Sequence, residues 1–125
     1  MRTHNTNQRD EELHMRFGSI CSGIEAASQA WAPLGWETVF VAETDPFPAA
    51  VLHHRWGATR PLRPLAAAEA VNEKDRKQRE SWEKQLATLP VEGIIPNLGD
   101  FTKIETEDYA GDIDLLVGGT PCQAY

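Results

Sequence analysis

The chain has 125 residues and a mass of 13.9 kDa, the size of one domain, and its 41% hydrophobic and 25% charged residues exclude a wholly disordered protein. No apolar run approaches the ~20 residues of a membrane span, and 12 basic against 19 acidic residues, a net charge of −7, argue against this chain alone gripping a nucleic-acid backbone. Two cysteines, Cys21 and Cys122, are too few for a disulfide framework, so we expect a cytoplasmic protein.

The beginning of the chain predicts a tail, a strand and a helix. Residues 1–14 are polar, lack the apolar stretch of a signal peptide and predict a mobile tail. The apolar run Met15–Cys21 predicts a strand that ends in the turn residues Ser22 and Gly23. The stretch Ile24–Trp31 is rich in alanine, which predicts a helix, and this helix should end at Pro33 and Gly35.

A second strand and a second helix follow. Thr38–Ala42 is apolar or β-branched throughout, which predicts a strand buried on both faces. Glu43 to Asp45 end this strand, and Pro46 opens the next helix, since proline suits the first helical position.

A charged insert of about residues 60–92 differs from its surroundings. Its stretch Leu65–Leu89 has few apolar positions, which favours a solvated helix or helical hairpin. Residues 58–92 carry seven basic and six acidic groups, so the signs nearly cancel. We therefore expect a solvated charged face here and not a nucleic-acid patch.

The last part predicts further strands of the same sheet. Residues 94–98 are apolar and precede Gly99-Asp100-Phe101, and Asp112–Val117 predicts a strand that runs directly into residues 118–123. Strands that alternate with helices predict an α/β fold with an open parallel sheet. Ligands of such sheets bind beyond the carboxyl ends of the strands, so candidate site residues are sought there.

The first candidate constellation combines Cys21-Ser22-Gly23 with Glu43, twenty residues after Gly23. A glycine after the first strand lets a ligand approach the backbone, and an acid after the second accepts hydrogen bonds from ribose hydroxyls. The full glycine pattern is missing, and Glu25 near a helix start would repel a pyrophosphate. Adenosine without phosphates therefore fits better than NAD. Taken alone, a glycine after a strand is more often only a turn.

Asp100 is the second candidate. Following a glycine, it most often caps a turn or a helix start. The functional alternative places its carboxylate at the tip of the third strand, where it accepts a hydrogen bond from an adenine amino group.

The third candidate is Gly118-Gly119-Thr120-Pro121-Cys122-Gln123. The glycines permit close approach of a ligand or base, and Pro121 stiffens the presentation of the thiol. A free cysteine is most often a small buried hydrophobe, but this position favours a nucleophile. No neighbouring basic residue lowers its pKa, so its activation must come from elsewhere in the fold or the substrate. His53 and His54 have no partners at metal-ligand spacing, and we expect no metal site.

Together these motifs resemble the amino-terminal part of DNA (cytosine-5) methyltransferases of the bacterial and phage restriction–modification type, from about Phe17 to Tyr125. The resemblance implies a Rossmann-like S-adenosylmethionine-dependent methyltransferase fold with a truncated parallel sheet flanked by helices. It implies methyl transfer to C5 of cytosine, with Cys122 as the nucleophile and Pro121 and Gln123 in the substrate loop. The residues that it implies for S-adenosylmethionine are Cys21, Ser22, Gly23, Ile24, Glu43, Thr44, Asp100, Phe101 and Gly118.

The sequence departs from the family pattern at three places. Cys21 stands where the family usually has Phe, and Glu25-Ala26 stand where it has a glycine pair. The chain ends two residues after Gln123, before the family's Glu-Asn-Val motif and its target-recognition domain. We therefore expect double-stranded DNA to be bound through that downstream region, and the isolated chain not to methylate DNA.

Two further hypotheses belong to other classes. The chain could be a non-catalytic remnant or a cofactor-binding module that needs a partner polypeptide. A nicotinamide-dependent oxidoreductase is disfavoured by the missing glycines and by Glu25.

Overall fold

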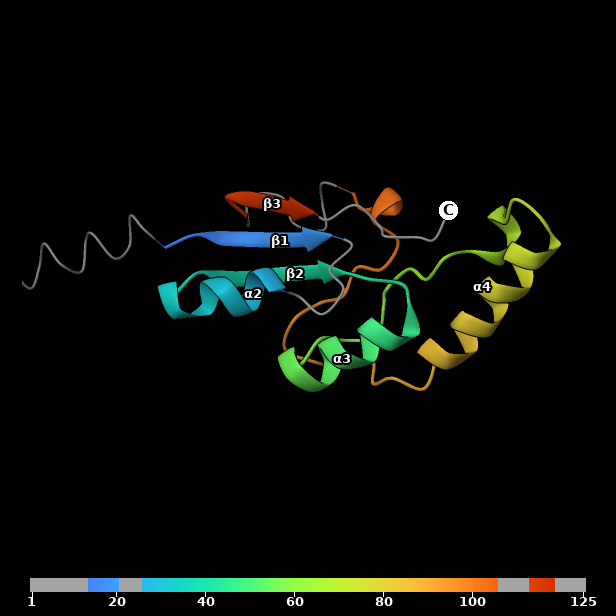
Figure 1. Ribbon diagram of the computed structural model, residues 1–125, viewed down its shortest axis with the longest axis horizontal. Helices are drawn as coiled ribbons and strands as arrows, with labels where there is room; N and C mark the ends of the chain where they lie inside the picture. The colour runs from blue at the N-terminus through green and yellow to red at the C-terminus, as the bar shows by residue number, and fades with distance from the viewer. Residues whose placement is uncertain (1–13, 21–25, 106–112, 119–125) are drawn as a thin grey trace, which may run out of the picture.

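A parallel sheet with helices along it forms the centre of the structure (Figure 1), and the computed structural model describes residues 14–20, 26–105 and 113–118. The regular elements are β1 (Arg16–Ile20), α2 (Ala26–Trp31), β2 (Glu37–Ala42), α3 (Pro46–Trp56), α4 (Glu73–Leu86) and β3 (Leu115–Gly118). Short 3₁₀ helices are η1 (Ala32–Leu34), η2 (Ala67–Glu69) and η3 (Phe101–Lys103). The predicted α/β alternation is confirmed. None of the helices within these ranges has the length and apolarity needed to cross a membrane.

The three strands lie in the order β2–β1–β3, with β1 in the middle. Both strand pairs are parallel, and Ile20 at the end of β1 lies opposite Ala42 of β2 and Gly118 of β3. All three strands therefore end at one edge of the sheet, which we call the carboxyl edge (Figure 1).

Aromatic side chains pack around β1. Phe17 is fully buried, and its ring meets the ring of Trp31 edge-on at a centroid distance of 5.0 Å. Trp36 packs on Trp31 in turn, at 4.9 Å. The ring of Phe40 covers Gly18 so closely that a Cβ atom there would come within 2.2 Å of it, so only glycine fits this position.

Helix α3 begins where its sequence predicts. The Asp45 side chain accepts a hydrogen bond from the Phe47 amide at 3.1 Å, Pro46 occupies the first turn, and Gly57 ends the helix with a φ of 72°. One side of α3 buries Leu52 against Val41 and Ala58. This small core fastens the helix to the end of β2.

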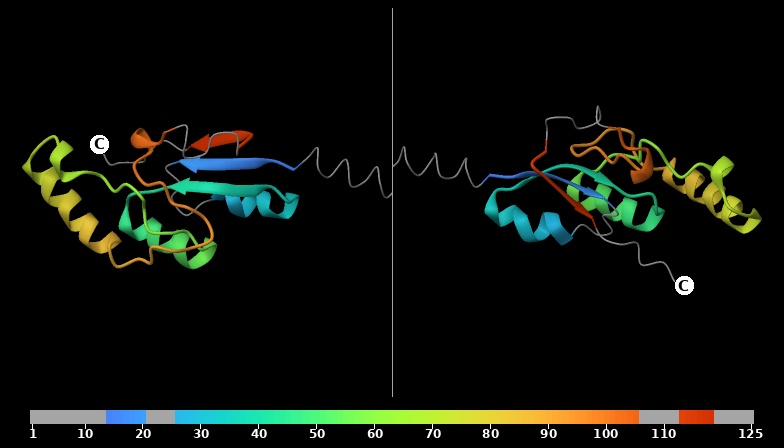
Figure 2. Two further views of the ribbon diagram at one scale, coloured as in Figure 1. Left: turned by 180° about the vertical axis from the view of Figure 1, so that it is seen from behind. Right: turned by 90° about the horizontal axis from the view of Figure 1, so that it is seen from above.

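Helix α4 packs on α3 and on η2. Its Leu86 forms a cluster with Leu89 and with Ala49 of α3. The Arg60 side chain donates hydrogen bonds to the carbonyls of Leu89, at 2.9 Å, and Ala87, at 2.7 Å, just past the end of the helix. Both views of Figure 2 show α4 beyond the carboxyl edge, away from β1 and β3.

The predicted third strand near residues 94–98 is wrong as a regular strand. Three isolated parallel bridges stand in its place, one of them joining Asn97 to Val41. Pro96 has no amide hydrogen, and the Asn97 amide donates to the Thr59 hydroxyl at 3.0 Å and not to a carbonyl. A continuous ladder is therefore interrupted, although residues 95–99 still run beside β2. The other two bridges, Ala58 with Ile95 and Arg63 with Gly99, add residues 58–63 outside this segment.

Two predicted boundaries are also corrected. The helix expected over Leu65–Leu89 is confined to α4, because Asn72 caps its start by accepting a hydrogen bond from the Asp75 amide at 2.8 Å. The last strand begins at Leu115 and not at residue 112. Just before it, the Asp114 carboxylate accepts a hydrogen bond from the Arg16 amide at 3.0 Å, so a side chain takes the place of a ladder bond.

Candidate functional site

Glu43 lies at the carboxyl edge, directly after the last residue of β2. Its Oε2 accepts hydrogen bonds from the backbone amides of Thr44, at 3.1 Å, and Asp45, at 3.0 Å. These bonds turn the carboxylate back over the chain that leads into α3, and the residue is half-buried. The structure thus holds an oriented acid where the sequence predicts one.

Asp100 lies at the same edge, after the segment that runs beside β2. It is 6% exposed, and its Oδ1 accepts hydrogen bonds from the amide and the hydroxyl of Thr102, at 3.0 and 2.7 Å. Asp100 therefore caps η3, which confirms the capping alternative. Because Oδ2 takes no part in these two bonds, capping and the predicted adenine contact do not compete for the same oxygen.

Asn97 connects these two acids, and sequence reasoning missed it. Its side chain is 1% exposed, and its Oδ1 accepts hydrogen bonds from the amides of Glu43, at 3.0 Å, and Gly99, at 2.9 Å. One amide oxygen thereby fixes the backbone at Glu43 and immediately before Asp100. The available signal was a polar side chain inside an otherwise apolar run, because a buried polar group needs partners.

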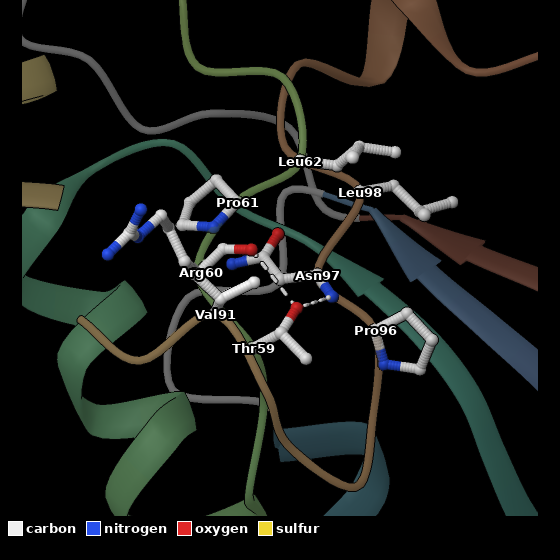
Figure 3. A pocket seen from close by; sticks show the side chains of 8 residues that line it. All are labelled: Thr59, Arg60, Pro61, Leu62, Val91, Pro96, Asn97 and Leu98. Atoms are coloured by element: carbon white, nitrogen blue, oxygen red, sulfur yellow. Dashed lines mark hydrogen bonds between the residues drawn. The ribbon is translucent and has the colours of Figure 1, made fainter. Parts of the chain in front are cut away.

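Asn97 also lines a cavity of about 300 Å³. Its lining residues are Thr59, Arg60, Pro61, Leu62, Val91, Pro96, Asn97 and Leu98 (Figure 3). The buried Nδ2 of Asn97 has no hydrogen-bond partner among the described residues. Neither Glu43 nor Asp100 lines this cavity.

The other predicted site residues fall into two groups. Thr44 follows Glu43, the ring of Phe101 is 44% exposed beside Asp100, and Gly118 ends β3. A Cβ atom at Gly118 would come within 2.7 Å of the Ile20 side chain, so glycine permits the close approach of β3 to β1 here. The remaining predicted site residues lie outside the described ranges: Cys21, Ser22, Gly23, Ile24, Pro121, Cys122 and Gln123.

The sheet nevertheless brings the starting points of both undescribed motifs together. Ile20 precedes Cys21, and Gly118 precedes Cys122 by four residues. Ile20 and Gly118 lie opposite each other in the sheet, and Ile20 also lies opposite Ala42, next to Glu43. The strands that lead to Cys21, Glu43 and Cys122 therefore end side by side, and Asn97 attaches the segment that carries Asp100.

Metal ligands do not gather in the described ranges, where no three His, Cys, Asp or Glu side chains lie close enough to hold an ion. The Nδ1 atom of His53 lies 3.0 Å from the Ala58 carbonyl, so this ring serves the end of α3. What the carboxyl edge offers is the carboxylates of Glu43 and Asp100, and the half-exposed ring of Phe101 follows Asp100 in the chain. Carboxylates accept hydrogen bonds from hydroxyl and amino groups, which are the donors of an adenosine.

Comparison with known proteins supports the sequence interpretation. The family model of C-5 cytosine-specific DNA methylases matches residues 66–125, a span that includes Asp100 and Cys122. The resemblance to cytosine-5 DNA methyltransferases is confirmed. This match begins inside the charged insert, so the first two motifs, around Gly23 and Glu43, lie outside it.

A phage protein is also similar to the chain. The DNA N-6-adenine-methyltransferase of Escherichia phage P1 is 39% identical over 112 residues. The match covers 87% of this chain but 10% of the phage protein, so the chain spans about a tenth of the length of that relative. No solved structure matches the chain significantly. Both matches are DNA methyltransferases, and their names specify different bases.

Proposed function

We propose that the chain forms the cofactor-binding and nucleophile-bearing part of a DNA cytosine-5 methyltransferase, with a Rossmann-like fold. The convergence of four segments at the carboxyl edge is the observation that supports it. With residues 95–99 beside β2, the segments lie in the order 95–99, β2, β1, β3. A doubly wound nucleotide-binding sheet has the order 3-2-1-4, and its ligand binds at the carboxyl ends where the order reverses.

The carboxyl edge suits S-adenosylmethionine, whose sulfonium supplies an electrophilic methyl group when it is bound. In this proposal Glu43 accepts hydrogen bonds from the ribose hydroxyls, Asp100 accepts one from the adenine amino group, and the Phe101 ring supplies an apolar surface. Cys21, Ser22, Gly23, Ile24, Thr44 and Gly118 complete the pocket. The carboxylate acceptors fit the hydroxyl and amino donors of an adenosine.

Cys122 carries the chemistry on the base. Its thiolate adds to C6 of a cytosine that has left the helix, which makes C5 nucleophilic enough to accept the methyl group. A base then removes the C5 proton, and the thiolate leaves as the C5–C6 double bond re-forms. Gly118, at the end of β3, lies four residues before Cys122.

Adenine N6-methylation is the second candidate, because the phage relative carries that name. An exocyclic amine can attack a methyl group without a covalent adduct, so Cys122 would have no role in that reaction. We favour cytosine because the cytosine-5 family match includes Cys122. The adenine activity, in contrast, is named for the phage protein, and the match covers only 10% of that protein. N6-methyladenine without 5-methylcytosine, in DNA treated with the protein and S-adenosylmethionine, would reverse this choice.

Calorimetric titration with S-adenosylhomocysteine tests the proposed pocket. We expect saturable binding that Glu43→Ala weakens at least tenfold, because the ribose hydroxyls lose a charged acceptor. Glu37→Ala is the matched control, since it removes a glutamate from the opposite end of the same strand. If the folded chain does not bind S-adenosylhomocysteine, or if the two substitutions weaken binding equally, the proposed role of Glu43 in a cofactor pocket is wrong.

A further inference from the structure

Helix α4 is densely charged. It contains four acidic and five basic residues among its fourteen. Its packed side carries Trp82 and Leu86 together with the ion pair of Arg79 and Asp75, whose Nε and Oδ2 lie 3.2 Å apart. Because each residue advances about 100° around an α-helix, the positions of the other charges follow from their numbers.

Three of the four acids of α4 are paired with arginines. Arg76 forms ion pairs with Glu73 and with Glu80, the latter at 2.7 Å. Glu69 in η2 pairs with Lys103 at 2.6 Å. Among the acids of α4 this leaves Glu83, which lies about 100° around the axis from Lys84.

Three lysines occupy the remaining face. Lys74, Lys77 and Lys84 are exposed, follow the i, i+3, i+10 spacing of one helix side, and form no ion pair within the described ranges. The neutral hydrogen-bonding residues Gln78, Ser81 and Gln85 lie on the same side, and the two acids beside it, Glu73 and Glu80, are both paired with Arg76. We call Lys74, Lys77 and Lys84 the lysine face.

The place of α4 in the molecule is relevant to DNA. Figures 1 and 2 show that the helix projects beyond the carboxyl ends of the strands, on the side where the proposed function brings a DNA base to Cys122. A duplex that delivers a base there extends well past the sheet, so its backbone can reach an element that projects on this side.

We propose that the lysine face binds the phosphate backbone of double-stranded DNA; the choice of partner rests on the proposed function. Lysines with neutral amide and hydroxyl donors contact phosphates without reading bases, so the contact positions the duplex and is independent of sequence. From the sequence, the near-zero sum of charges over residues 58–92 predicts a solvated face and not a nucleic-acid patch. The sum is correct, but it conceals that three of the four acids of α4 are paired with arginines, whereas its lysines form no ion pair within the described ranges.

Fluorescence anisotropy with a labelled duplex tests the lysine face. Each phosphate contact contributes about 0.9 to the slope of log affinity against log salt. We expect the combined substitution Lys74→Gln, Lys77→Gln and Lys84→Gln to lower that slope by about 2 to 3 and to weaken binding at least tenfold at low salt. The matched control is Gln29→Glu, Ala32→Glu and Leu34→Glu, which changes net charge equally at exposed positions around α2 and η1.

The control should retain most of the wild-type affinity and slope. No measurable DNA binding by the wild-type chain at low salt, or equal losses in the lysine variant and the control, would overturn the proposal. S-adenosylhomocysteine titration of the lysine variant separates this inference from the proposed function. A lysine variant that binds the cofactor normally but has lost DNA binding supports the proposed role of the lysine face. A folded variant that has lost both kinds of binding contradicts the proposal that these lysines contact only DNA.

Discussion

The two ends of the sheet are built from different chemistry. Near its amino end, Phe17, Trp31 and Trp36 pack ring against ring, and the contacts are apolar. At the carboxyl edge, Glu43, Asp100 and the buried Asn97 are joined by side-chain-to-backbone hydrogen bonds. The first arrangement serves stability, because it removes apolar area from water. The second places oriented acceptors at an edge, which stability alone does not require.

Of the substitutions that test this comparison, we expect Phe17→Ala to change the free energy of unfolding most. The side chain is fully buried, so its loss should lower the free energy of unfolding by about 3–5 kcal/mol. Phe47→Ala is the matched control, because that ring is 73% exposed and its removal should change stability by no more than about 0.5 kcal/mol. Chemical denaturation of the two variants measures the difference. Similar losses of unfolding free energy in both variants would show that the aromatic packing around Phe17 is not a main source of stability.

Asn97→Ala should affect both stability and ligand binding. It leaves the amides of Glu43 and Gly99 without their acceptor, at a cost of about 1–3 kcal/mol for each buried donor. It should also weaken S-adenosylhomocysteine binding, since both acids lose their fixed positions. Asn72→Ala removes an asparagine that caps exposed α4, and should cost about 1 kcal/mol without changing ligand affinity. Denaturation and titration of both variants separate the two roles.

Equal ligand affinity of the Asn97 and Asn72 variants, once both are shown to be folded, would mean that Asn97 supports the sheet alone. Both ends of the sheet would then serve stability, and no ligand-binding role could be assigned to Asn97.

The smallest effect concerns pH and the start of α4. The hydrogen bond from the Val71 amide, with help from Arg79, lowers the pKa of Asp75. A lowered folded-state pKa means that the charged form stabilises the fold above the unfolded pKa of about 3.9. This contribution disappears as the pH falls through the folded value. Thermal unfolding should therefore show Asp75→Asn less stable than wild type at pH 7, with the difference closing below about pH 4.

A gap between wild type and Asp75→Asn that stays constant down to pH 3 would contradict this assignment. It would mean that the aspartate acts through packing or hydrogen-bond geometry and not through its charge.

Local patterns predict much of the fold and little of how the site is joined. The strands around Phe17 and Val41 follow from apolar runs, and α3 follows from Asp45 and Pro46, because these signals act within a few residues. The bonds of Asn97 reach Glu43, 54 positions away, and no short pattern encodes them. The third strand fails for a local reason, since Pro96 interrupts the ladder that its apolar neighbours suggest.

The charges of α4 illustrate a different limit. Counting them predicts neutrality, and the count is right. Whether Glu73 and Glu80 both turn toward Arg76 depends on side-chain conformation, which composition does not contain. The 3.6-residue period could have placed the lysines on one side, but it could not have shown which acids were already paired.

The outer segments of the sheet also determine how it can grow. Residues 58–63 and 95–99 close one border with isolated bridges, and the prolines in them offer no amide to an added strand. At the other border β3 pairs, within the described residues, with β1 alone. A further strand, from the same polypeptide or another, is therefore directed to the β3 side, where it would extend the sheet away from α4.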